Sequence, residues 1–175
     1  MTARVEYISK GRTEENRGVV IDIAIPGKGG FRIDYLILDL NGTIAVDGAL
    51  ISGVRKRLKE LSELVDIIVV TADTHQNAER LLNDLPVSLH RIEETEESAQ
   101  KERLVLQKGK DRTICVGNGR NDVLMLKESA IGICIVGTEG ASGEAVMSAD
   151  LVVKSIDDAL DLLLKPHRMK ASLRR

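Results

Sequence analysis

The chain has 175 residues, of which 43% are hydrophobic and 30% charged, with a formal net charge of −2 at pH 7. This length suits one domain that buries roughly 70% of the surface its unfolded chain would expose, so no stabilising disulfide or metal is needed. The near-neutral charge and the scarcity of aromatic residues argue against a nucleic-acid partner, and no apolar run reaches the ~18 residues of a membrane helix.

The N-terminal third of the chain begins with a polar stretch. Residues 1–18 show no helical or strand period, which predicts a loosely held extension. Residues 19–25 are apolar and β-branched, and a Pro/Gly-rich break separates them from Phe31-Arg32-Ile33. This arrangement predicts a β-hairpin over residues 19–33.

Short, continuous apolar runs recur from Tyr35 onward, and runs of this kind predict strands that are covered on both faces. They occupy residues 35–38, 67–70, 114–116, 131–136 and 151–153. Segments with helical spacing lie between them; one such stripe consists of Val54, Leu58, Leu61 and Leu64. The alternation predicts an α/β fold with a three-layer α/β/α, doubly wound parallel sheet.

The last helix of this sheet is predicted from a capping box and a stop signal. Ser155 and Asp158 have the spacing of a capping box, and the stripe that follows ends at Pro166. A single domain is therefore expected over residues 19–165. The basic residues of 166–175 are expected to form a solvated tail.

Both cysteines, Cys115 and Cys134, fall inside predicted strands. Two buried thiols in a chain without a recognisable signal peptide predict a reducing, cytoplasmic location and no disulfide.

Doubly wound sheets bind ligands beyond the carboxyl ends of their strands. The residues at these ends are Asp39-Leu40-Asn41-Gly42-Thr43, Thr71-Ala72 and Gly117-Asn118-Gly119-Arg120-Asn121-Asp122. A strand-end carboxylate followed by a glycine turn suits a nucleophilic Asp that forms an aspartyl-phosphate. Thr71 can donate a hydrogen bond, Lys101 can supply a positive charge, and Asp39 with Asp122 can bind Mg²⁺ through oxygen.

In order and spacing these residues resemble the four motifs of the haloacid-dehalogenase superfamily. The motifs are Asp39-x-Asn-Gly-Thr43, Thr71, Lys101 and Gly117-x-Gly-x-Asn-Asp122. The similarity extends from about residue 35 to 164 and is greatest to the soluble P-type-ATPase-like branch, with its D-K-T-G-T, T-G-D and G-D-G-x-N-D signatures.

The resemblance implies a Mg²⁺-dependent phosphatase or soluble ATPase-like hydrolase that acts on a phosphorylated small molecule or nucleotide. Its implied site residues, by role, are catalytic Asp39, Asn41, Thr71 and Lys101; substrate-binding Gly42, Thr43, Thr71, Ala72, Lys101 and Asn121; and metal-binding Asp39, Asn41, Asn118 and Asp122.

Each of these residues also has a purely structural interpretation. Asp39 could end a strand at a turn, Thr71 could cap a helix, and Asp122 could be an acid in the first turn of a helix. Lys101 could be a solvated helix lysine like Lys108 and Lys110. His75, His90 and His167 lack metal-ligand spacing and are expected to be surface or capping residues.

Two positions depart from the family pattern. Asn41 stands where haloacid-dehalogenase phosphatases carry the Asp that transfers protons, and an amide cannot do this. Asn118 stands where the P-type branch has the first Asp of G-D-G, which removes one negative charge from the cation site. The alternative function is therefore a very slow or non-catalytic phosphate-binding or regulatory module.

The interval between Thr43 and the helix near Ser52 is too short for a cap domain. An uncapped site is expected either to accept a large substrate or to be covered by a neighbouring subunit in a homo-oligomer. A signalling receiver domain also uses Asp, Thr and Lys, but there the acidic pair precedes the phosphorylated Asp in the chain. Here Asp122 comes long after Asp39, which disfavours a receiver domain.

Overall fold

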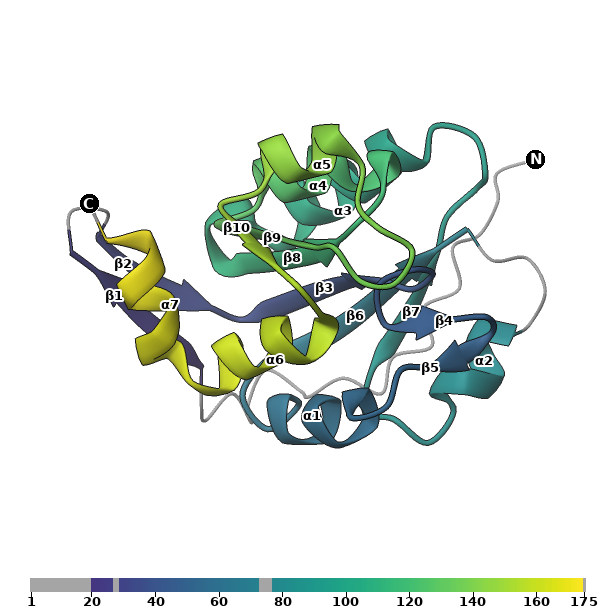
Figure 1. Cartoon of the computed structure of the whole chain (residues 1–175), viewed down its shortest axis with the longest axis horizontal. Helices are drawn as coiled ribbons and strands as arrows, with labels where there is room; N and C mark the ends of the chain where they lie inside the picture. The colour runs from purple at the N-terminus through teal and green to yellow at the C-terminus, as the bar shows by residue number, and fades with distance from the viewer. Residues whose placement is uncertain (1–19, 27–28, 73–76, 175) are drawn as a thin grey trace.

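A computed structural model of the chain describes residues 20–26, 29–72 and 77–174. Its centre is a six-stranded parallel sheet of order β10-β9-β8-β3-β6-β7 (Figure 1). The strands are β3 (Tyr35–Asp39), β6 (Asp66–Thr71), β7 (Ser88–Arg91), β8 (Thr113–Gly117), β9 (Ile131–Ile135) and β10 (Leu151–Val153). All the predicted core strands are present, with β7 added at one edge.

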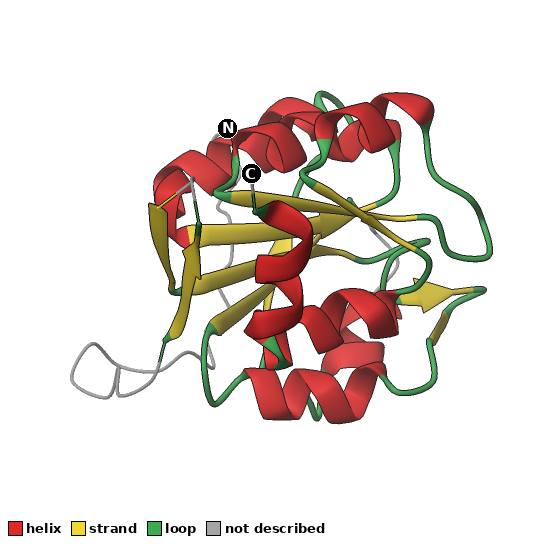
Figure 2. Ribbon diagram, turned by 60° about the vertical axis from the view of Figure 1, so that its left-hand side comes forward, coloured by secondary structure: helices red, strands yellow, loops and turns green. Residues whose placement is uncertain are grey.

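Helices cover both faces of the sheet, which confirms the predicted three-layer fold (Figure 2). One face packs against α1 (Val54–Leu61), α2 (Asn77–Leu82) and α6 (Ile156–Leu164). The other packs against α3 (Glu97–Lys108), α4 (Val123–Glu128) and α5 (Gly143–Ser148). Two short 3-10 helices, η2 (Lys110–Arg112) and η3 (Arg120–Asp122), flank β8.

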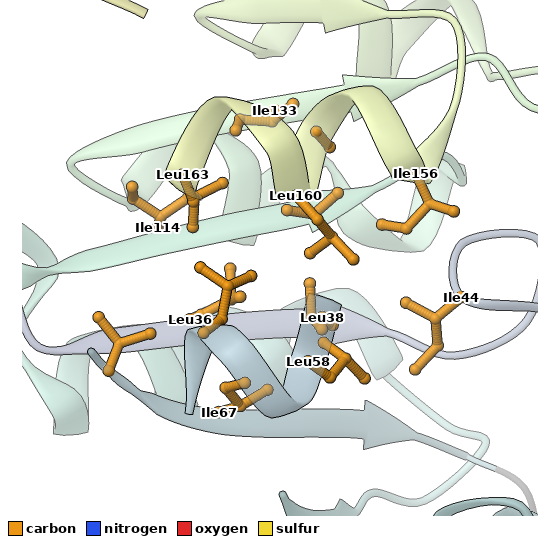
Figure 3. Close-up of a cluster of buried hydrophobic side chains, with 14 of the residues drawn as sticks. Leu36, Leu38, Ile44, Leu58, Ile67, Ile114, Ile133, Ile156, Leu160 and Leu163 are labelled. Carbon is orange, nitrogen blue, oxygen red and sulfur yellow. The ribbon is translucent and has the colours of Figure 1, made fainter. Parts of the chain in front are cut away.

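The two faces explain the continuous apolar runs. Along β3, Leu36 and Leu38 point into one core and Ile37 into the other, and β6 and β8 alternate in the same way. Figure 3 shows the first core, in which Leu36 and Leu38 lie between α1 and α6. Beyond the first residues of β3 and β6, the side chains of the four central strands are buried, which is why the runs are continuously apolar up to the strand ends.

The helix caps and stripes follow the sequence closely. Ser155 Oγ accepts the Asp158 N–H at 3.2 Å and donates to Asp158 Oδ2 at 2.8 Å, so Ser155 is the N-cap of α6. The helix buries Ile156, Ala159, Leu160 and Leu163. In α1 the stripe stops at Leu61, because the helix ends there and Leu64 lies in the following turn.

The N-terminal hairpin is confirmed as β1 (Ile21–Ile25) paired antiparallel with β2 (Gly29–Ile33). It forms a separate two-stranded sheet at the end of the molecule where β3 begins (Figure 1). The hairpin therefore lies at the opposite end of the sheet from the strand carboxyl ends. The predicted extension over residues 1–18 is outside the described residues.

The expected solvated tail differs from the structure, because Pro166–Leu173 forms a helix, α7. Pro166 occupies the first turn, where its missing N–H costs nothing, so it ends α6 and begins α7. Met169 and Leu173 are buried against the hairpin side of the core, while Arg168 and Arg174 are exposed. The prediction of a tail used only the basic residues, whereas the buried apolar residues Met169 and Leu173, four positions apart, mark a helix face.

The strand order places the topological switch point at β3. The chain runs from β3 to β6 and β7 on one side and then crosses to β8, β9 and β10 on the other. A small antiparallel pair, β4 (Ala45–Val46) with β5 (Ala49–Leu50), follows β3 at its carboxyl end. It fills the interval expected to be too short for a cap, and it is the only insertion there.

Close packing of α4 on β9 depends on Gly132. A β-carbon at this position would lie 2.2 Å from the Leu126 carbonyl oxygen, a backbone atom that cannot turn aside. We expect Gly132→Ala to lower the free energy of unfolding by about 1–3 kcal/mol, measured by chemical denaturation. Gly143→Ala is the control, because nothing lies within 4 Å of its β-carbon position; an equal loss in both variants would contradict the packing argument.

Candidate active site

Three charged side chains from three separate elements meet at the carboxyl end of the sheet. Lys101 Nζ of α3 donates to Asp39 Oδ1 at 2.8 Å and to Asp122 Oδ1 at 2.7 Å. All three residues are buried: Lys101 and Asp122 are 0% exposed and Asp39 is 7% exposed. A lysine is almost never fully buried unless it is paired, so the location of Lys101 is set by these two carboxylates.

This cluster carries more negative than positive charge. Burial, and then the charge of Asp122, raise the pKa of Asp39 from 3.8 to about 7, although Lys101 acts in the opposite direction. Burial alone would lower the pKa of Lys101, but the charges of Asp39 and Asp122 outweigh it and raise that pKa. Lys101 therefore stays cationic, and the carboxyl groups of Asp39 and Asp122 share its single positive charge.

The loop after β8 positions Asp122. Asp122 Oδ2 accepts the backbone N–H of Asn118 at 3.0 Å and of Gly119 at 2.9 Å. This fold requires glycine at 117, because a β-carbon there would lie 2.4 Å from Asp122 Oδ2. The other oxygen of Asp122, Oδ1, accepts from Lys101, so Asp122 accepts three hydrogen bonds in all. In this structure the Asp122 carboxylate is therefore a partner of Lys101 and of the backbone.

The turn after β3 brings the Asp39 motif together with the loop after β8. Gly42 has φ +75°, a conformation that other residues rarely adopt, and its N–H bonds the Ala45 carbonyl at 2.8 Å. The Thr43 hydroxyl lies 3.3 Å from Asp39 Oδ2 and 3.2 Å from Asn118 Oδ1, so it can donate to either. Thr43 thus connects the two motifs directly.

Thr71 and Ala72 lie at the carboxyl end of the strand next to Asp39. In the register of β3 and β6, Asp39 is opposite Val70, and buried Thr71 is the next residue. Thr71 belongs to the strand, and five residues separate it from the start of α2, so it does not occupy a cap position of that helix. Its position at the strand end agrees with the predicted site.

Asn41 and Asn121 hold different places at the rim. Asn41 is exposed in the turn after Asp39, while Asn121 Nδ2 donates to Glu97 Oε2 of α3 at 2.6 Å. The Asn121 amide is therefore held against α3. Of the alternative lysines, Lys110 is exposed and bonded to Glu128, so Lys101 is the lysine of this site.

Glu139, on the loop between β9 and α5, was not predicted as a site residue from the sequence. Its Oε2 lies 2.7 Å from where a Gly42 β-carbon would be, the same distance as Asn118 Nδ2. The backbone beside it is tied to the site, since Asn118 Nδ2 donates to the Gly140 carbonyl at 3.1 Å. Attention to the residues after the apolar run 131–136, as after the other strands, would have found it.

The donors present fit a magnesium ion. Among the described residues no group of three or more His, Cys, Asp or Glu side chains is arranged to hold a metal. Mg²⁺ does not need such a cage, because it binds through one or two carboxylates and keeps several waters. Asp39 Oδ2 and Asn118 Oδ1 lie 3.3 and 3.2 Å from the Thr43 hydroxyl oxygen, and oxygen donors of this kind suit a hard cation.

His90 and His167, the two histidines that the structure describes, take no part in this cluster. His167 is exposed on α7, and His90 is half-buried on β7, where burial and then the charge of Lys108 lower its pKa. His75 lies outside the described residues. Cys115 and Cys134 are free and buried, and burial raises the pKa of both thiols.

The chain is similar to proteins of known sequence, although no family model matches it. It is 48% identical over 73 residues to an uncharacterized protein of Methanocaldococcus jannaschii, covering 42% of this chain and 78% of that one. It is 28% identical over 136 residues to the soluble P-type ATPase-like phosphatase of the same organism, covering 76% of this chain. The match spans only 50% of that phosphatase.

Solved structures share the fold. The 3-deoxy-D-manno-octulosonate 8-phosphate phosphatase of Moraxella catarrhalis, solved with magnesium, phosphate and KDO, superposes with a TM-score of 0.61 at 14% identity, covering 76% of this chain and 86% of that one. The cobalt-bound enzyme of Haemophilus influenzae gives 0.64 at 14% identity, covering 79% and 91%.

The fold and the site define a class of Rossmann-like proteins with a carboxylate site at the strand ends. In this chain the switch-point strand ends in Asp39, which is bonded to Lys101. A glycine turn follows it, and the second buried carboxylate is Asp122. Together with the ordered motifs and the similarities above, these features confirm the resemblance of the chain to the haloacid-dehalogenase superfamily.

Proposed function

We propose that this protein is a Mg²⁺-dependent phosphohydrolase that works through an aspartyl-phosphate on Asp39. The observation that supports this most directly is the burial of Asp39 at the topological switch point, bonded to Lys101 and adjacent to the Gly42 turn. Its similarity to a soluble P-type ATPase-like phosphatase agrees with the proposal. The substrate would be a phosphorylated small molecule or a nucleotide.

In the first step, a carboxylate oxygen of Asp39 forms a bond to phosphorus while the bond from phosphorus to the leaving oxygen breaks. The leaving oxygen takes a proton from water. In the second step, water attacks the same phosphorus, inorganic phosphate departs, and the Asp39 carboxylate is regenerated.

Lys101 holds Asp39 in place during this reaction and supplies positive charge to the phosphoryl oxygens. Asp122 acts through Lys101, and the Thr71 hydroxyl is the donor expected to orient the phosphoryl group. Asp39, Asn118 and the Asn41 segment would hold Mg²⁺, whose charge would offset the negative charge that develops on the phosphoryl oxygens.

A slow or non-catalytic phosphate-binding module is the second candidate. It is favoured by Asn41, which is exposed where the superfamily's phosphatases use a proton-transferring Asp. The module would keep the phosphate site while losing most of the turnover, since positioned proton transfer contributes about 10²–10⁴-fold.

A phosphate-release screen tests the proposal. Purified protein is incubated with p-nitrophenyl phosphate, acetyl phosphate and ATP, with Mg²⁺ or with EDTA. We expect release that depends on Mg²⁺. Absence of release from every compound, while phosphate still protects the protein from thermal unfolding, would favour the binding module.

The Asn41→Asp variant distinguishes the two candidates. Because Asp can transfer a proton to the leaving oxygen and from the attacking water, we expect it to raise turnover by up to about 10²–10⁴-fold. The steady-state rate of phosphate release measures this. An unchanged rate in Asn41→Asp, with Mg²⁺ binding intact, would show that the site lacks more than a proton carrier.

We also propose that the protein is located in the reducing cytoplasm, because both of its cysteines are buried and free. No helix among the described residues has the length and apolarity to cross a bilayer. Oligomerisation over the uncapped site is a further proposal. The hairpin lies at the opposite end of the six-stranded sheet from the site of the same chain, so we propose that it covers the site of a neighbouring subunit (Figure 1).

A further inference from the structure

We infer that Glu139, on the loop between β9 and α5, supplies the negative charge for the cation that Asn118 no longer provides. This inference rests on the Mg²⁺-dependent function proposed above and identifies a further cation-binding residue of the same site. It is carried by the meeting of Glu139 and Asn118 at Gly42.

The position of Glu139 is defined by the turn after β3. Glu139 Oε2 and Asn118 Nδ2 both lie 2.7 Å from the point that a Gly42 β-carbon would occupy, and Asn118 Oδ1 lies 3.1 Å from it. A carboxylate and an amide from two different loops therefore occupy the space beside Gly42 that a β-carbon would need. The missing side chain of Gly42 is what allows them to approach the turn.

Contacts within the site hold the loop of Glu139 in this place. Asn118 Nδ2 donates to the Gly140 carbonyl at 3.1 Å, and the Ser142 N–H donates to the Asn118 carbonyl at 2.9 Å. Gly137, with φ +61°, turns the chain at the point where its β-carbon would lie 3.5 Å from the Gly42 carbonyl. The Gly137 N–H donates to the Lys154 carbonyl at 2.9 Å, so the backbone is held before Glu139 by Lys154 and after it by Asn118.

The charges of the site explain why a carboxylate is useful here. Asp122 Oδ1 accepts from Lys101 and Oδ2 from two backbone amides, so that carboxylate is neutralised. Asp39 shares the same lysine, and Asn118 is neutral. Glu139 is exposed and has no ion pair among the described contacts, so its full charge can act on a cation bound beside Asn118. Affinity of oxygen sites for divalent cations rises with the number of charged ligands.

Magnesium binding without substrate tests the inference. Isothermal titration with MgCl₂, and the rise of the melting temperature with Mg²⁺, are compared in wild type, Glu139→Gln and Glu144→Gln. Glu144 is the control because it is an exposed carboxylate of the neighbouring helix α5, paired with Arg120. We expect Glu139→Gln to raise the Mg²⁺ dissociation constant about three- to tenfold, with Glu144→Gln close to wild type.

Asn118→Asp completes the test. A carboxylate at residue 118 should tighten Mg²⁺ binding, and in that background Glu139→Gln should have a smaller effect, because the charge is already present. An unchanged Mg²⁺ dissociation constant in Glu139→Gln, or equal weakening in both Glu variants, would overturn the inference and leave the proposed function standing. No Mg²⁺ binding by the wild type would overturn the inference together with the magnesium dependence of the proposed function.

Discussion

We expect the Asp39→Asn variant to lose phosphate release by at least about 10³-fold, because the amide cannot form the bond to phosphorus. The variant should remain folded, since Asn has the same shape and Lys101 retains Asp122 as its partner. Steady-state release with Mg²⁺, together with acid-stable labelling of the wild type by ³²P, measures the loss. Equal turnover in both proteins would exclude Asp39 as the nucleophile.

The same variant should be more stable than the wild type at neutral pH in EDTA. Burial and the charge of Asp122 raise the pKa of Asp39 from 3.8 to about 7. Deprotonation is therefore harder in the folded chain than in the unfolded chain, so the wild type loses stability as the pH rises from about 4 to about 7. Asn carries no charge at any pH and escapes this loss.

The expected gain in unfolding free energy is on the order of 1–4 kcal/mol at pH 8 and vanishes near pH 4. Urea denaturation at the two pH values measures it. A variant that is less stable than the wild type at pH 8 would show that the carboxylate of Asp39 is stabilising, contrary to the charge balance described here.

The Lys101→Met variant is expected to have the largest effect on stability. Methionine can fill the space of the lysine stem but leaves Asp39 and Asp122 buried without their shared ammonium. Removing one partner of a buried ion pair costs about 3–5 kcal/mol, because the remaining charge stays uncompensated. Phosphate release should also fall to background, since the charge that faces the phosphoryl group is gone.

Chemical denaturation of Lys101→Met measures this effect, and Lys110→Met is the matched control. Lys110 is exposed, and its bond to Glu128 is a surface contact, so its removal should change stability little. The loss in Lys101→Met should shrink at lower pH, where Asp39 binds a proton. Similar stability of the two variants would mean that Lys101 does not compensate these carboxylates.

The fold was predictable from the sequence because it depends on repeated local patterns. Buried parallel strands require continuous apolar runs, and the helices between them require a stripe at helical spacing, so both leave clear signals. The prediction of a solvated basic tail was wrong although this segment also carries a local pattern. The prediction used its four basic residues and did not use Met169 and Leu173, which have the spacing of a buried helix face.

The sequence by itself determined which motifs stand at strand ends, because glycines, hydroxyls and carboxylates interrupt otherwise apolar runs at Asp39, Thr71 and Gly117. Only the tertiary structure decided how these groups share their charges. It places Lys101 between two buried carboxylates and satisfies Asp122 with backbone amides. It also brings Glu139 to Gly42 across nearly one hundred residues. Such long-range contacts depend on how loops fold over the sheet, and no local spacing records them.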